Sequence, residues 1–287
     1  MYTYPLYRPP SEARSLIIQI TEGCSHNKCK FCYMYKEKKF RIKSKDEIKN
    51  HIKELKEEYP KPRRIFLADG NVLCLKTSKI IEILNLIKET FPNNTRISSY
   101  SGPKDLLNKS EAELKEIKKA GLDMLYIGVE SGSDEVLEFM RKGVNSEQMK
   151  NACVKAKDSG FIISCMIISG LGGRALIEEH AMKSAILISK IKPHYLGLLR
   201  LTIDENSELV EEIRQGNFQL LTPKEVLFQN KIFIENIDSE GTIFRANHVS
   251  NLLNLSGTFN KDKKFMLDEI KYYLENNKDI HDFNHGI

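Results

Sequence analysis

Three cysteines stand close together near the beginning of the chain, at Cys24, Cys29 and Cys32. They follow the first apolar segment, residues 16–20, and the sequence offers no obvious fourth thiol beside them. A structural zinc site normally takes four protein ligands in a closed tetrahedron. A cubane iron–sulfur cluster, in contrast, can be held by three thiolates, with one iron left open for a small molecule. The spacing therefore favours a [4Fe–4S] cluster with one open coordination position.

Two other interpretations of these cysteines stay open. A zinc ion could take His26 or His51 as its fourth ligand, which would make the protein a non-catalytic zinc-binding module, or the three thiols could be unrelated. The remaining cysteines, Cys74, Cys153 and Cys165, are isolated in the sequence, and we expect them to be small buried residues. The position of the cysteine run, on a loop after the first strand of an α/β repeat, favours the cluster.

Length and composition restrict the class of protein without deciding its function. The 287 residues suit one large domain with an appendage or one α/β barrel, and 41% hydrophobic residues allow a sizeable core. A net charge of +5 does not indicate nucleic-acid binding, although it does not exclude it. No segment approaches the roughly 18 apolar residues that span a bilayer, and the N-terminus lacks the apolar core of a signal peptide. We expect a cytoplasmic protein with no membrane partner.

Short apolar runs alternate with amphipathic stretches along most of the chain, which predicts alternating strands and helices. The predicted strands are residues 16–20, 64–67, 96–100, 124–129, 162–168 and 195–201. Helix start signals stand at Ser44 with Glu47, Ser110 with Glu113, Asn145 with Gln148 and Thr222 with Glu225. Six strand–helix units in series predict a parallel sheet with right-handed crossovers, either open or closed into a barrel.

Unusual residues follow four of the predicted strands. The cysteine run follows the first strand, residues 69–71 the second, residues 130–132 the fourth and residues 169–173 the fifth. In an open sheet and in a barrel alike, chemistry is found at the carboxyl ends of parallel strands. We therefore expect these four loops to form one rim.

The alternation of strands and helices ends after about residue 202. Residues 204–207 predict the opening of a short helix, and Thr222 with Pro223 predicts a second helix. Residues 247–251 predict a polar turn, residues 262–274 a closing helix, and residues 276–287 a frayed end.

The cysteine run resembles the signature of the radical SAM superfamily, in which an aromatic residue usually precedes the third cysteine, as Phe31 does here. The commonest spacing in that superfamily has three and then two residues between the cysteines, whereas this chain has four and then two. The resemblance covers residues 12–275 and is closest to poorly characterised relatives of tRNA-modifying and coproporphyrinogen-oxidase proteins. The matching phrases are residues 21–29, Phe-Leu-Ala-Asp-Gly-Asn at 66–71, Tyr-Ile-Gly-Val-Glu-Ser-Gly-Ser at 126–133, and Arg-Ala-Asn-His at 245–248.

This resemblance implies an α/β fold, a partial (β/α)6 TIM-like barrel over residues 12–202, with a helical C-terminal extension over residues 203–287 that covers the barrel. It also implies two cofactors, a [4Fe–4S] cluster and S-adenosylmethionine (SAM), and an electron donor such as flavodoxin or ferredoxin. The reduced cluster would cleave SAM to methionine and a 5′-deoxyadenosyl radical, which abstracts hydrogen from a substrate. Such an enzyme orients its reactants and excludes water, so the lack of an obvious catalytic triad is expected.

The same resemblance implies which residues contact SAM. Asp69, Gly70 and Asn71 would hold its amino group, although an ordinary Asp-Gly turn remains an alternative. Glu130 and Ser131 would hold the ribose, or would instead cap the helix that begins near residue 133. Arg141 would contact the SAM carboxylate, with a place on a solvated helix face as the alternative. Phe31 and Ile168 would contact the adenine.

A polar segment near the C-terminus is the candidate substrate site. Arg245, Asn247 and His248 lie close together in a stretch too polar for a core, and Arg245 and Asn247 face the same way if the stretch is extended. A structural role is the alternative for the histidine. A small-molecule substrate is favoured, because no RNA-binding domain can be recognised after the barrel, while modification of RNA or protein stays open.

Overall fold

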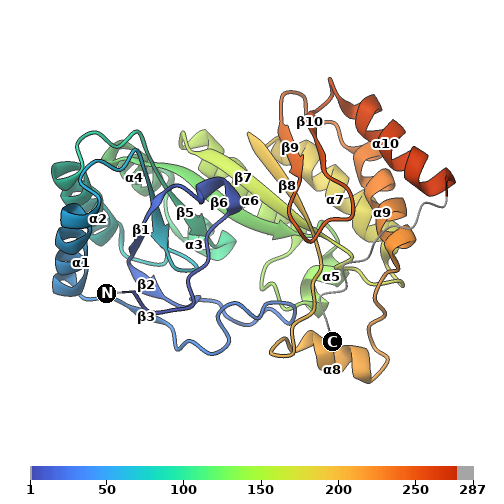
Figure 1. The fold of residues 1–287 in the computed structure, drawn as a ribbon, viewed down its shortest axis with the longest axis horizontal. Coiled ribbons are helices and arrows are strands. Elements are labelled where there is room, and N and C mark those ends of the chain that lie inside the picture. Colours follow the sequence, from blue (N-terminus) through green and yellow to red (C-terminus); the bar gives the residue numbers. More distant parts are fainter. Residues whose placement is uncertain (1, 277–287) are drawn as a thin grey trace. The chain divides into compact units, whose positions relative to one another are not determined.

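The computed structural model describes residues 2–276, and within them most strands belong to one sheet (Figure 1). The sheet has eight strands in the order β1-β4-β5-β6-β7-β8-β9-β10. Its strands are β1 (Leu16–Gln19), β4 (Arg64–Ala68), β5 (Arg96–Ser101), β6 (Leu122–Glu130), β7 (Ile162–Ser169), β8 (Tyr195–Arg200), β9 (Ile243–Ala246) and β10 (Leu255–Thr258). A separate two-stranded sheet contains β2 (Thr21–Glu22) and β3 (Arg41–Ile42).

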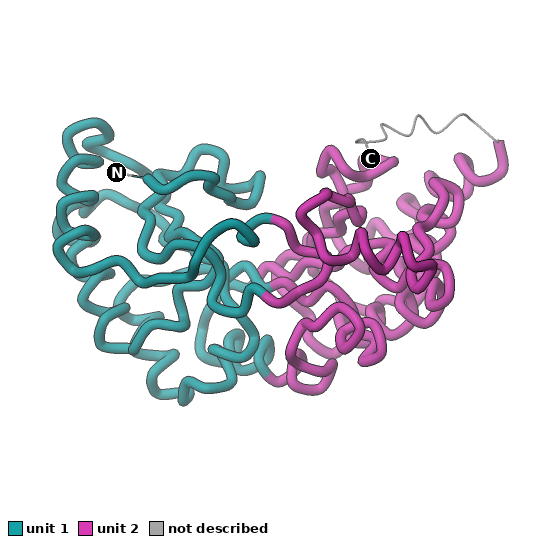
Figure 2. The backbone as a smooth tube through the Cα atoms, turned by 90° about the horizontal axis from the view of Figure 1, so that it is seen from below, with its two compact units in different colours: residues 1–27, 34–127, 152–163 teal, residues 28–33, 128–151, 164–287 magenta. Residues whose placement is uncertain are grey.

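The chain divides into two compact units, coloured separately in Figure 2. The first unit contains residues 1–27, 34–127 and 152–163, and the second contains residues 28–33, 128–151 and 164–287. The boundary expected from the sequence, between residues 202 and 203, falls inside the second unit and stays a prediction.

The first unit contains parallel strands with helices between them. Strand β4 pairs in parallel with β1 and with β5, and β5 pairs in parallel with β6. The helices are α1 (Lys45–Glu58), α2 (Thr77–Thr90), α3 (Pro103–Asn108) and α4 (Glu111–Ala120), with the 3₁₀ helix η1 (Pro10–Glu12) ahead of them. Strand β4 is buried along four of its five residues, as expected for a parallel strand covered on both faces.

The second unit continues this pattern and then changes it. Strand β8 pairs in parallel with β7 and β9, whereas β10 pairs antiparallel with β9. Its helices are α5 (Asp134–Phe139), α7 (Ile177–Ile191), α8 (Leu209–Arg214), α9 (Pro223–Asn236) and α10 (Lys263–Glu275), while α6 (Ser146–Asp158) contributes residues to both units. Helices α7 and α9 pack side by side (Figure 1).

The predicted α/β fold is confirmed, because the central sheet is mostly parallel and all six predicted strands lie within two residues of observed strands. The capping boxes at Ser44, Ser110 and Thr222 are present, and Asn145 and Gln148 exchange the expected hydrogen bonds. The short helix α8 begins at Leu209, after the predicted opening at residues 204–207.

Four short strands were not predicted from the sequence: β2, β3, β9 and β10. The last two make the C-terminal extension partly β-structure, and they extend the main sheet. The closing helix was predicted within one residue of its observed bounds. The predicted frayed end lies outside the described residues apart from Asn276, a turn residue. None of the described helices is long and apolar enough to cross a membrane.

Candidate functional site

The loop after β4, residues 69–71, holds the residue before Cys24. Asp69 Oδ2 accepts a hydrogen bond of 3.0 Å from the Gly23 amide, and the Gly70 amide donates to the Gly23 carbonyl at 3.2 Å. A Cβ atom at position 70 would lie 3.1 Å from Cys24 Cβ and 3.2 Å from its Cα. A side chain at position 70 would therefore press on Cys24, which glycine avoids.

Asn71 holds the residue after Cys24. Its Nδ2 donates to Ser25 Oγ at 2.9 Å and to the Asp105 carboxylate, while its Oδ1 accepts from the Gly102 amide at 3.2 Å. The residue is 2% exposed, so these bonds replace water almost completely. Both neighbours of Cys24 are therefore fixed by side chains of loop 69–71.

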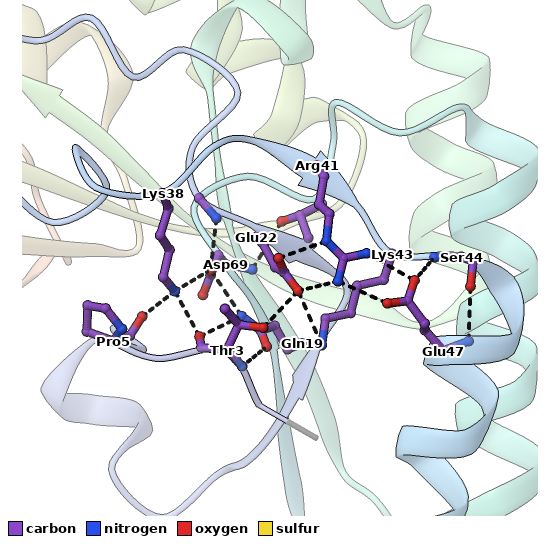
Figure 3. Close-up of polar contacts among 12 residues, drawn as sticks. Thr3, Pro5, Gln19, Glu22, Lys38, Arg41, Lys43, Ser44, Glu47 and Asp69 are labelled. Atoms are coloured by element: carbon purple, nitrogen blue, oxygen red, sulfur yellow. Dashed lines mark hydrogen bonds and ion pairs between the residues drawn. The ribbon is translucent and has the colours of Figure 1, made fainter.

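Asp69 lies in a buried polar network of the first unit, drawn in Figure 3. Lys38 Nζ lies 3.1 Å from its Oδ2, and Gln19 Nε2 donates to the same oxygen at 3.2 Å (Figure 3). Burial raises the pKa of the Asp69 carboxyl, and the bonds from Gly23 and Lys38 oppose that rise. Its other oxygen, Oδ1, is buried with no hydrogen-bond partner among the described residues. A buried acceptor without a partner is costly and suits a donor from a ligand.

This network continues from Gln19 toward helix α1. Gln19 accepts a hydrogen bond from the Thr3 amide, and the Thr3 hydroxyl donates to Glu22. Glu22 in turn accepts two bonds from Arg41, which also contacts the capping residue Glu47 (Figure 3). The polar groups around loop 69–71 are thus tied to the small β2–β3 sheet and to the start of α1.

Cys24 belongs to the first unit, while Cys29 and Cys32 belong to the second, and all three are half-buried. Within residues 2–276, which include all six cysteines of the chain, no disulfide is present. Across the same residues, no three His, Cys, Asp or Glu side chains are gathered to hold one metal ion. A cubane takes each thiolate on a different iron, so its ligands need not meet at one point. A half-buried position on a loop suits a cluster ligand, and each of the three cysteines has such a position in its own unit.

Of the other three cysteines, two have the buried positions expected of structural residues, and Cys74 is half-buried. Cys153 and Cys165 are fully buried. The Cys74 thiol donates to the Asn71 carbonyl at 3.1 Å, and burial raises its pKa to about 12. A thiol with so high a pKa is protonated at neutral pH and is a poor metal ligand. His51, an alternative zinc ligand, is 3% exposed and its ring packs edge-on against Tyr2 at 4.7 Å.

The turn after β6, residues 130–133, carries the predicted ribose contacts in the second unit. Glu130 adopts a left-handed backbone conformation with φ of 67°, which is uncommon for a residue with a side chain and concentrates at functional sites. Its carboxylate is paired with Lys142 at 3.1 Å. The cap of helix α5 is Ser133, whose hydroxyl accepts from the Val136 amide. Glu130 and Ser131 therefore do not serve as that cap.

His180, on α7, connects this turn to the end of β7. Its Nε2 lies 3.0 Å from the Ile168 carbonyl, which only accepts, so Nε2 carries the proton. Burial lowers the pKa of His180 to about 4, so the ring is neutral and Nδ1 accepts from the Ser131 hydroxyl at 2.8 Å. The His180 ring thus connects Ser131, a predicted ribose contact, to Ile168, a predicted adenine contact.

The sequence analysis did not find His180, although a signal was present. His180, Ser184, Ile188 and Ile191 recur at helical spacing, and all four are buried. Polar residues on the buried face of an amphipathic helix need hydrogen-bond partners. Ser184 has one as well, because its Oγ accepts from the Gly132 amide at 2.9 Å.

The other predicted SAM contacts lie in the second unit. Phe31 and Ile168 are half-buried and pack against the same core cluster, which contains Val136, Met140, Leu171, Leu209 and Phe218. Arg141 is exposed and its guanidinium pairs with Glu208 at 2.8 Å, so the structure directs it to a carboxylate of the chain itself. Its role toward SAM stays a prediction.

The predicted substrate residues lie at the end of β9 and in the turn that follows. Arg245 is exposed and its guanidinium donates to the Phe244 carbonyl at 2.7 Å, and Asn247 is exposed as well. His248 is half-buried, and its Nδ1 lies 2.8 Å from Ser250 Oγ, which accepts from the Arg200 amide at the end of β8. Burial lowers the pKa of His248. Of the three residues, only His248 is partly enclosed.

Comparison with known proteins identifies the family. The Radical SAM superfamily profile matches residues 18–185, more than half of the chain. The chain belongs to the radical SAM superfamily.

The individual sequence relatives have low identity to this chain. A candidate methylthiotransferase of Methanocaldococcus jannaschii is 29% identical over 225 residues, which cover 72% of this chain and 49% of that protein. The heme chaperone HemW of Buchnera aphidicola is 26% identical over 145 residues, which cover 50% of this chain and 37% of that protein. The chain thus spans about half or less of the length of these relatives.

Solved structures support the fold. Methylornithine synthase (PylB) is 17% identical with a TM-score of 0.55, and the match covers 90% of this chain and 81% of that one. Coproporphyrinogen III oxidase (HemN) of Escherichia coli, at 15% identity and a TM-score of 0.51, also shares it. A tRNA uridine(34) acetyltransferase of M. jannaschii is a further sequence relative. The predicted resemblance to tRNA-modifying and coproporphyrinogen-oxidase proteins is confirmed.

Proposed function

We propose that this chain is an enzyme that uses a [4Fe–4S] cluster on Cys24, Cys29 and Cys32 to cleave SAM reductively and abstract hydrogen from a substrate. The observation that carries the proposal is the clamp around Cys24. Loop 69–71 fixes the residues on both sides of this cysteine, while the cysteine itself forms no disulfide. A thiol held in place by its neighbours is prepared for a ligand at little cost in conformational entropy.

The cluster, when bound, supplies the electron that cleaves SAM to methionine and a 5′-deoxyadenosyl radical. The chain's own residues bind and orient SAM. Asp69 Oδ1 is buried with no hydrogen-bond partner in the part of the chain that the structure describes, and a buried carboxylate oxygen suits the SAM ammonium. Glu130 would accept from ribose hydroxyls, and Phe31 and Ile168 would offer apolar surface to the adenine. Arg141 would exchange its partner Glu208 for the SAM carboxylate.

The buried contacts around these residues also serve to exclude water. Ser131 and His180 satisfy each other in the interior, so the turn needs no water to hold its shape. An electron donor such as flavodoxin or ferredoxin would reduce the cluster.

The experiment is anaerobic reconstitution with iron and sulfide, followed by dithionite and SAM. We expect a broad absorbance near about 400 nm that dithionite bleaches, and formation of 5′-deoxyadenosine. Cys29→Ala should lose most iron and all SAM cleavage, whereas Cys153→Ala, at a fully buried cysteine, should keep both. Equimolar zinc without colour would instead support the zinc-binding module.

A small molecule is the proposed substrate class, and His248 its proposed contact. His248→Ala should keep the cluster and lose turnover of the true substrate, with slower SAM cleavage in its absence. Because relatives carry names that refer to methylthio transfer and to tRNA, a bulk tRNA sample belongs in the substrate screen. Modification of tRNA with no small-molecule turnover would overturn the small-molecule assignment.

A further inference from the structure

Lys30, between Cys29 and Cys32, is bound through its backbone to two separate helices of the second unit. Its amide donates to the Met140 carbonyl at 3.1 Å, directly after α5. Its carbonyl accepts from the Leu209 amide at 3.0 Å and from Ser207 Oγ at 2.9 Å, at the start of α8. A loop residue with three such bonds has little freedom to move.

The side chain of Lys30 adds two charged contacts. Its Nζ forms an ion pair with Glu212 on α8 at 2.5 Å, and it lies 4.2 Å from the centre of the Phe139 ring. Phe139 is itself stacked on Phe218, with 6.1 Å between ring centres. The ammonium is therefore held between a carboxylate and an aromatic face.

Because Lys30 is buried, its charge would be costly without the Glu212 carboxylate and the Phe139 ring. Lys30 is only 9% exposed, whereas lysine is almost never buried unless it is paired. Phe31, the next residue, packs against the core cluster that contains Met140, Leu209 and Phe218. Both residues between Cys29 and Cys32 are thus bound to the same part of the second unit, which includes α8 from the C-terminal extension.

We propose that Lys30 and Glu212 are positioning residues that fix Cys29 and Cys32 for cluster assembly, and that α8 exists in this fold as the anchor of that loop. The role in cluster assembly rests on the proposed function, but the positioning of Cys29 and Cys32 can be tested without any cluster. It assigns residues 207–212 a role in preparing the cluster site, although none of these residues is a predicted ligand.

The first experiment measures alkylation of each cysteine by iodoacetamide in the full chain without iron, read by peptide mass spectrometry. The variants are Lys30→Met, Glu212→Gln and the conservative Lys30→Arg. We expect alkylation of Cys29 and Cys32 to rise about tenfold in the first two, because local opening of the loop becomes easier. Cys24, which is clamped within the first unit, should keep its rate, and Lys30→Arg should stay near wild type.

Two features of this experiment separate positioning from simple electrostatics. Removing the Lys30 cation alone would lower the thiolate fraction and slow alkylation, so a rise in Lys30→Met reports opening of the loop. Glu211→Gln is the matched control, because Glu211 lies on the same helix and its side chain is 61% exposed. Equal rates in wild type, Lys30→Met and Glu212→Gln would overturn the proposal.

The second experiment reconstitutes the same variants with iron and sulfide. We expect Lys30→Met and Glu212→Gln to retain less iron and to lose it several-fold faster to a chelator, with Glu211→Gln unchanged. Full, stable iron content in the Lys30→Met Glu212→Gln double variant would overturn the role in assembly. If wild type takes up no cluster while the variants alkylate faster, the proposed function fails and the positioning of Cys29 and Cys32 stands.

Discussion

Loop 69–71 and turn 130–133 both fix a predicted ligand-binding residue, but they do so with different chemistry. Loop 69–71 uses the Asp69 carboxylate, a lysine and the Asn71 amide to hold the neighbours of Cys24. Turn 130–133 is held on α7 through the Ser131 hydroxyl and the neutral His180 ring, with one further bond from the Ser133 hydroxyl to the Glu179 carboxylate.

The glycines of the two segments, Gly70 and Gly132, differ in what an added Cβ atom would meet. A Cβ at position 70 would lie 3.1 Å from the Cys24 side chain and 3.0 Å from the Tyr35 ring, whereas a Cβ at position 132 would lie 2.2 Å from the Lys183 backbone oxygen. The first approach is to a residue predicted to bind a ligand, and the second is to the scaffold. The difference indicates that loop 69–71 is shaped around Cys24, while turn 130–133 is built into the framework and carries Glu130.

The strongest test of this comparison is removal of the thiol that loop 69–71 holds. Cys24→Ala should lose most iron and all 5′-deoxyadenosine formation, because a cubane with two protein ligands is not retained. Cys74→Ala is the matched control, since Cys74 also lies half-buried in the first unit. Iron analysis and SAM cleavage are the measurements. Equal loss of iron in both variants would show that the clamp around Cys24 does not mark the ligand.

The next effect concerns SAM affinity at turn 130–133. Removing a charged hydrogen bond typically costs about 1.5–3 kcal/mol, so Glu130→Ala should weaken SAM binding by roughly tenfold to a hundredfold with the cluster retained. Calorimetry on the reconstituted protein measures this change, and Glu138→Ala, at an exposed position on α5, is the control. An unchanged dissociation constant for Glu130→Ala would place the ribose elsewhere.

The two glycines allow a test that should separate cluster binding from stability. Gly132→Ala should destabilise the fold by about 1–3 kcal/mol, because its Cβ meets backbone atoms that must shift. Gly70→Ala should lower the free energy of unfolding less than Gly132→Ala does, and it should lower the iron content more, since its Cβ presses on Cys24. Denaturant unfolding of the iron-free protein and iron content after reconstitution give the two readouts. The reverse pattern would contradict the assignment of the two loops.

The last expected effect is one that appears only at low pH, the pH dependence that His180 gives to turn 130–133. Its pKa is about 4 in the folded chain and 6.5 as the ordinary value, so the unfolded state binds more protons between these limits. Stability that is present above pH 6.5 is therefore lost as the pH falls toward 4, by up to about 1.4 kcal/mol per pH unit.

His180→Gln keeps a donor and an acceptor but cannot titrate. Its unfolding free energy, measured by urea titration from pH 7 to pH 4.5, should fall less steeply than that of wild type. Parallel curves for the two proteins would mean that His180 is not buried as a neutral ring.

Local signals in the sequence determined strands β1 and β4 to β8, several helix starts and the cysteine run. Buried parallel strands read as continuous apolar runs, and a capping box such as Ser44 with Glu47 spans only three residues. Strand β9 was missed because it has four residues and includes the exposed Arg245, so it carries no apolar run of its own.

Only the tertiary structure decided which side chains support the predicted site. Ser131 and His180 are 49 residues apart, and Lys30 and Glu212 are 182 apart, so no local pattern links them. Each pair forms because packing buries a polar group that then needs a partner. The same burial left Asp69 Oδ1 without a hydrogen-bond partner among the described residues, while Arg141, at an exposed position, pairs with Glu208 of its own chain. Residue types and spacing indicated the chemistry, and the burial of distant segments against one another determined how its residues are held.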